Sequence, residues 1–94
     1  MRSVATAVVF AVVLAACGGL GAADREALAR LEGRWMCDVQ RFTFEDVGAI
    51  ESELEARVVA AGYAVSDYAE FKAILAETPD LREQVRKAYE EYCA

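Results

Sequence analysis

The fold of this chain follows from residues 24–42, which read DREALARLEGRWMCDVQRF. Apolar side chains recur along this segment at intervals of three and four residues, which is the spacing of one helical face. They are Leu28, Leu31, Trp35, Val39 and Phe42. Asp24 stands where a carboxylate can accept hydrogen bonds from the free amides of a helix start. The segment therefore predicts a helix that begins at Asp24 and buries this face.

A second helix is predicted to follow directly. Thr43 and Asp46 have the spacing of a capping box. Phe42 and Val47 have the spacing of a hydrophobic staple around that cap. The apolar stripe of the helix is Val47, Ile50, Leu54, Val58 and Ala61. Gly62 is expected to close the helix, because glycine readily adopts the left-handed conformation.

Two shorter helices complete the prediction. Ser66 is expected to cap a helix that buries Tyr68, Phe71, Ile74 and Leu75. Thr78-Pro79 predicts a new helix start, because proline at the first helical position loses no hydrogen bond. The inner face of this last helix is Leu81, Val85, Ala88 and Tyr92. No stretch alternates as a strand does, so the fold class is all-α, a small bundle of three to four short helices.

Residues 1–16 have the three parts of an export signal. A basic start with Arg2 is followed by an apolar run from Val4 to Ala16 and by small residues at its end. A permanent transmembrane helix is the alternative, but it needs about 20 apolar residues and this run is shorter. We therefore expect residues 1–16 to be removed as a signal peptide.

The end of this run, Leu14-Ala15-Ala16-Cys17, resembles the lipobox of bacterial lipoprotein precursors. The resemblance covers only these residues and does not extend to the rest of the chain. It implies that a diacylglyceryl group is attached to the Cys17 thiol and that cleavage occurs before Cys17. Its new amino group often receives a further acyl chain, such as palmitate. An ordinary secretory signal would leave Cys17 without a role.

The resemblance also implies a location in the cell envelope. Two or more acyl chains hold a protein firmly on a membrane, whereas one chain holds it only marginally. Gly18 follows the cysteine, where aspartate commonly retains Gram-negative lipoproteins in the inner membrane. We therefore expect the outer membrane facing the periplasm in a Gram-negative host. In another host we expect the outer face of the plasma membrane.

Cleavage would leave 78 residues with a net charge of −7, against −6 for the whole chain. Such an acidic domain would repel nucleic acid and anionic lipid, so neither is an expected partner. Residues 17–23 are rich in glycine and predict a flexible tether behind the lipidated cysteine. Residues 24–94 form the predicted helical domain. A domain of this size is only marginally stable without a covalent link.

Cys37 and Cys93 are the two cysteines left when Cys17 carries a lipid, and an even number in an oxidising compartment predicts one disulfide. It would link the C-terminus to the first helix. At about 100° per residue, Cys37 lies opposite the apolar face of that helix, on its outer flank. Gly33 lies one turn earlier on this flank. We expect the segment around Tyr92 and Cys93 to pack closely over it. The alternative is a first helix that breaks near Gly33.

Little in the sequence predicts catalysis. The chain has no histidine, the commonest general base and a usual zinc ligand. Three hydroxyls of the domain stand at expected helix caps, and they are Thr43, Ser66 and Thr78. The densest carboxylates are Glu51, Glu53 and Glu55, which favour a solvated, ion-paired helix face over a catalytic pair. We therefore expect no enzyme, no cofactor and no metal site.

Three aromatic residues fall outside the predicted stripes and are candidates for a protein-docking patch. They are Phe44, Tyr63 and Tyr89. The expected function is a membrane-anchored, non-enzymatic protein-interaction or accessory module with an unidentified protein partner. The alternative is a small ligand- or cell-wall-binding lipoprotein, which would need a pocket.

Overall fold

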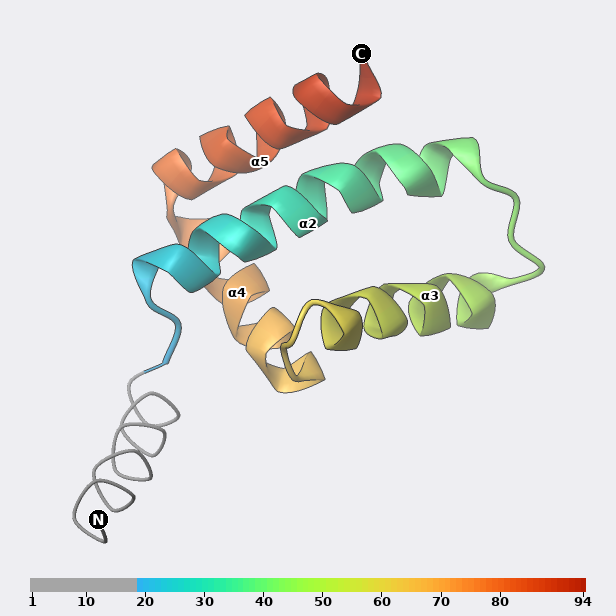
Figure 1. Cartoon of the computed structure of the whole chain (residues 1–94), viewed down its shortest axis with the longest axis horizontal. Helices are drawn as coiled ribbons and strands as arrows, with labels where there is room; N and C mark the ends of the chain where they lie inside the picture. Colours follow the sequence, from blue (N-terminus) through green and yellow to red (C-terminus); the bar gives the residue numbers. More distant parts are fainter. Residues whose placement is uncertain (1–18) are drawn as a thin grey trace, which may run out of the picture.

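The computed structural model describes residues 19–94, which form four α-helices and no strand within that range (Figure 1). The helices are α2 (Ala22–Arg41), α3 (Val47–Ala60), α4 (Val65–Glu77) and α5 (Pro79–Cys93). The predicted all-α fold is confirmed, including the disulfide between Cys37 and Cys93. The predicted signal peptide and the lipobox with Cys17 lie outside the described residues. Within them, no helix has the length and apolar character needed to cross a membrane.

Helix α2 is the central element of the fold (Figure 1). Helix α5 lies beside it and runs in the same direction, while α3 runs back on the other side. Helix α4 crosses near the N-terminal half of α2 and connects the two flanking helices. The contact of α2 with α5 is the most extensive in the domain.

Because it has neighbours on two sides, α2 buries more than the single predicted stripe. Leu28 and Trp35 are buried as predicted, whereas Phe42 is 53% exposed because it follows the last helical residue. Ala29 and Cys37 are also buried, on the side that faces α5. The prediction that Cys37 lies on an outer flank is therefore wrong. Its side chain has 0% exposure.

The close approach predicted at Gly33 is confirmed, but different residues make it. A Cβ atom on Gly33 would lie 2.7 Å from the Ala88 Cβ and from the Tyr89 backbone nitrogen. It would lie 2.8 Å from the Val85 carbonyl oxygen. The contact thus falls on α5 about one turn before the predicted Tyr92. Cys93 lies further along, against Cys37.

Helix α3 begins later than predicted. Asp46 is its N-cap and accepts a hydrogen bond from the Ala49 amide at 2.8 Å, so Thr43 is not the cap. The predicted staple is also wrong, since Val47 is 69% exposed and Phe42 is exposed as well. Val58 is the only fully buried residue of the predicted stripe. Gly62 has a φ of +94°, which confirms the predicted left-handed helix end.

The starts of α4 and α5 show where hydroxyl capping fails. Helix α4 begins at Val65, one residue before the predicted Ser66 cap. The N-cap is Ala64, and the Asp67 carboxylate three residues later accepts a hydrogen bond from its amide at 2.8 Å. Helix α5 begins at Pro79 as predicted, although the Thr78 side chain makes no capping hydrogen bond.

The core extends into the predicted tether. Leu20 is 8% exposed and belongs to one apolar cluster with Leu28, Ala29, Phe71, Leu81 and Val85. Its amide donates to Glu70 Oε2 at 3.2 Å, and its carbonyl accepts from Arg25 Nε at 3.2 Å. Helix α2 begins at Ala22, two residues before the predicted start. The prediction of a flexible tether up to residue 23 is therefore wrong from Leu20 onward.

We expect Leu20→Ala to lower the free energy of unfolding by about 2 kcal/mol, because it removes a leucine side chain from a packed cluster. Urea unfolding followed by circular dichroism measures this change. Val47→Ala is the control, since Val47 is largely exposed and should change stability by less than about 0.5 kcal/mol. Equal effects of the two substitutions would show that Leu20 is not part of the core.

Candidate functional site

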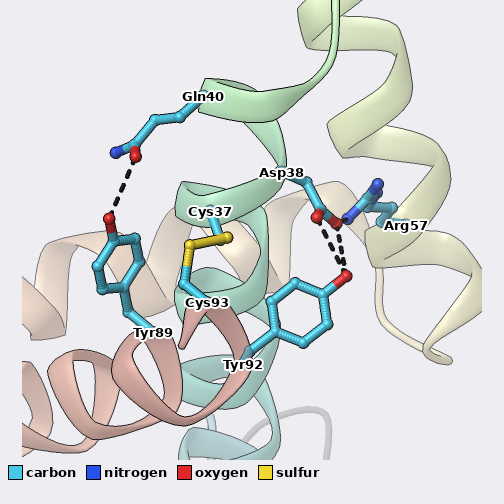
Figure 2. Close-up of a disulfide and its surroundings, with 7 residues drawn as sticks. All are labelled: Cys37, Asp38, Gln40, Arg57, Tyr89, Tyr92 and Cys93. Carbon is cyan, nitrogen blue, oxygen red and sulfur yellow. Dashed lines mark hydrogen bonds and ion pairs between the residues drawn. A yellow bond between two sulfur atoms is a disulfide. The ribbon is translucent and has the colours of Figure 1, made fainter.

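A buried carboxylate links three helices at the disulfide end of the domain (Figure 2). Asp38 on α2 is 3% exposed. Its Oδ2 accepts a hydrogen bond from Arg57 Nη1 of α3 at 2.5 Å. The Tyr92 hydroxyl of α5 lies 3.0 Å from Oδ1 and 3.2 Å from Oδ2. Both oxygens are thus satisfied, which is what a buried charge requires.

The disulfide next to this carboxylate explains why Tyr92 can reach it. Cys93 follows Tyr92 and is bonded to Cys37, which precedes Asp38, with 5.7 Å between the two Cα atoms. Figure 2 shows the disulfide on the α2–α5 side and the Asp38 cluster beside it. The covalent bond therefore fixes the last turn of α5 in register with α2.

The surroundings of Asp38 change its pKa in opposite directions. Burial alone would raise the pKa of this carboxyl group. The hydrogen bonds from Arg57 and Tyr92, with the charges of Arg57 and Arg41, outweigh burial and bring the pKa below its ordinary value of 3.8. Because the pKa is lower in the folded state, the stabilisation by Asp38 is complete above the unfolded pKa. It is lost as the pH falls through the lowered value.

We expect Asp38→Asn to reduce the free energy of unfolding at pH 7 by about 1 to 2 kcal/mol, because a charged hydrogen-bond acceptor is lost. The difference from the wild type should shrink when the pH falls well below 3.8, where the wild-type carboxyl is protonated too. Urea unfolding at pH 7, 4 and 2.5 measures this. Glu55→Gln, on the exposed part of α3, is the control. A difference that stays constant down to pH 2.5 would contradict the account.

A second buried carboxylate, Glu32, joins α2 to α4. It is hydrogen-bonded by the Tyr68 hydroxyl and by Lys72 Nζ, the latter at 2.5 Å. Burial and the bond to Glu32 raise the pKa of Tyr68. Like Asp38, Glu32 accepts hydrogen bonds from one cationic side chain and one tyrosine hydroxyl. The two carboxylates lie about 9 Å apart along the helix axis and have no shared partner.

The three aromatic residues of the predicted docking patch lie in different surroundings. The Phe44 ring packs edge-on against Trp35, with 6.0 Å between the ring centroids. The Tyr63 hydroxyl donates to Asp24 Oδ1 at 2.9 Å, near the start of α2. The Tyr89 hydroxyl donates to Gln40 at 3.1 Å, near its end (Figure 2). All three are half-buried, and no contact between them brings them into one patch.

A groove between α2 and α3 is lined by three arginines. The sequence did not predict this groove. Its volume is about 420 Å³, and it is lined by Ala27, Arg30, Leu31, Arg34, Arg57 and Ala61. The α2 residues follow the spacing i, i+3, i+4 and i+7, so they form one helical stripe. We name this site the arginine groove. The spacing of Arg30 and Arg34 was visible in the sequence, but the approach of Arg57 depends on how α3 packs.

Two aromatic rings hold the guanidinium groups of this groove. The Arg57 Cζ lies 5.0 Å from the centre of the Trp35 ring. The Arg34 Cζ lies 5.4 Å from the centre of the Tyr92 ring. A cation over an aromatic face at such distances is attracted to it. The Asp38 cluster and the disulfide therefore position two of the three arginines.

The described residues contain no group of three or more potential metal ligands. Comparison with family models, with curated proteins and with solved structures gave no match. The arrangement that remains is a positively charged groove on an acidic helical domain.

Proposed function

We propose that this chain is a membrane-anchored envelope lipoprotein, lipidated on Cys17, whose helical domain is a non-enzymatic protein-interaction or accessory module. In a Gram-negative host it would be attached to the outer membrane and face the periplasm. The lipobox-like residues before Cys17 and the disulfide between the other two cysteines support an exported, oxidised protein.

The observation that carries the proposal is the packing of Leu20. Only Gly18 and Gly19 separate Cys17 from this buried side chain. Three residues span at most about 10 Å, so a lipid on Cys17 would hold the domain against the headgroups. A domain in that position can act on partners at the membrane surface. It cannot reach across a periplasm.

Exposed apolar side chains favour a protein partner. Phe42, Val47, Val59 and Val65 are all exposed. Apolar surface of this kind contributes to protein–protein contacts more than to catalysis.

The alternative, a small ligand- or cell-wall-binding lipoprotein, is favoured by one observation. The arginine groove has a volume of about 420 Å³, which falls in the range of small-molecule sites. A ligand there would carry negative charge.

The anchor is tested by growing cells with an alkyne-bearing fatty acid and purifying the protein. We expect label on the wild type and none on Cys17→Ser. The interaction role is tested in the same intact cells with a photo-crosslinking residue at Phe42 or at Leu31. We expect a discrete crosslinked protein from at least one position. An unlabelled wild type would overturn the anchor, and no crosslink from either position would overturn the interaction role.

A further inference from the structure

We propose that the arginine groove binds a carboxylate-bearing polypeptide segment, whose acidic side chains pair with Arg30, Arg34 and Arg57. The proposal rests on the interaction role given above and adds the chemistry of the partner.

The charge of the groove is opposite to that of the rest of the domain. The chain has 16 acidic and 10 basic residues, yet no carboxylate lines this groove. Each of the four other grooves described in the domain is lined by at least one acidic residue. The arginine groove therefore has the most positive lining of the five, and an acidic ligand would be attracted there most strongly. The groove next in charge has Lys72, Arg82 and Arg86 against Glu32. This difference in charge favours an acidic partner and directs it to the arginine groove.

The guanidinium groups retain hydrogen-bonding capacity for a ligand. Arg34 makes no hydrogen bond or ion pair with the described residues, and its ring contact with Tyr92 leaves its N–H groups free. Arg57 uses Nη1 for Asp38 and Nε for Glu53, and Nη2 has no partner among the described residues. Arg30 pairs with Glu26, but both side chains are more than half exposed. An exposed pair of this kind is weak and exchanges readily.

The apolar residues of the groove favour a polypeptide over a bare anion. Leu31, Ala27 and Ala61 supply apolar surface between the charges. A phosphate polymer has nothing to bury there. A peptide can place apolar residues on this surface while its carboxylates reach the guanidinium groups. Arg30 and Arg34 are one helical turn apart, with about 5 to 6 Å between their Cβ atoms, which matches carboxylates one turn apart on a peptide helix.

The test uses the full lipoprotein in detergent and a labelled peptide with glutamates one helical turn apart and leucines between them. Fluorescence anisotropy measures its affinity for three proteins. These are the wild type, Arg30→Gln with Arg34→Gln, and Arg86→Gln with Lys87→Gln as a control. The control removes the same charge from exposed positions on α5. We expect the groove variant to bind about 30-fold more weakly, because two charge-assisted contacts are lost. The control should stay within about twofold, and a peptide with glutamine for glutamate should not bind.

Three results would overturn the proposal: no binding by the wild type, equal loss in both variants, or preference for inorganic polyphosphate or anionic vesicles over the peptide. Melting curves of both variants are recorded to check that each is folded. The photo-crosslinking experiment in cells distinguishes a failure of this inference from a failure of the interaction role. If the wild-type crosslink persists in the folded groove variant, the domain binds a partner by another surface, and only the groove inference fails.

Discussion

Replacing Gly33 with leucine is expected to lower the free energy of unfolding by at least about 3 kcal/mol and the melting temperature by roughly 15 °C. The α5 backbone leaves no room at this position. A single Cβ would already lie 2.7 Å from the Tyr89 nitrogen and 2.8 Å from the Val85 oxygen. Backbone atoms of a helix cannot move aside individually, so α5 as a whole must shift away from α2. The disulfide at Cys37 opposes that shift.

The matched control is Ala23→Leu, which adds a larger side chain on the exposed surface of the same helix. It should change stability by less than about 0.5 kcal/mol. Thermal unfolding of both variants by circular dichroism gives the comparison. If the Gly33 and Ala23 variants melted together with the wild type, α5 would not pack against α2 as described.

Removal of the disulfide is the second large effect. We expect Cys37→Ala with Cys93→Ala to lower the free energy of unfolding by roughly 4 kcal/mol. The bond closes a loop of 56 residues and restricts the unfolded chain accordingly. The fold also loses the constraint that keeps Tyr92 on Asp38. In a domain of this size, such a loss approaches the whole stability.

Urea unfolding measures this effect in the wild type, before and after reduction, and in the double alanine variant. Reduced wild type should resemble the variant, and reductant should not change the variant further. If reduction left the wild-type midpoint in place, the bond would not contribute to stability.

Helix existence could be predicted where local signals are strong. Gly62 and Pro79 mark an end and a start through their own backbone preferences, which need no tertiary information. The pairing of Cys37 with Cys93 followed from cysteine number and compartment. The starts of α3 and α4 were predicted less accurately. Thr43 and Ser66 were predicted as caps, but the amide hydrogen bonds at the starts of α3 and α4 go to Asp46 and Asp67. A carboxylate accepts such bonds more strongly than a hydroxyl does.

The misplaced residues share a cause in tertiary packing. A single apolar stripe was predicted for α2, but two neighbours bury two sides of it, including small residues such as Ala29. Conversely, Val47 has the right spacing for the α3 stripe but lies where α3 has no cover. Periodicity shows which residues share a face. It does not show how much of that face another helix covers.

The candidate site depends still more on packing. Arg30 and Arg34 come from α2 and Arg57 from α3, and only the antiparallel return of α3 brings them to one groove. The burial of Asp38 could not be predicted either, because aspartate is rarely buried without a partner and both partners are distant in sequence.

Intact mass spectrometry of the protein from the host membrane fraction examines the proposed lipid anchor and the disulfide together. We expect the mass of residues 17–94 plus acyl chains, less two hydrogens. Reduction should restore those two hydrogens and leave the acyl mass in place. A soluble, unacylated protein would contradict the anchor and add Cys17 as a third thiol to the cysteine pairing.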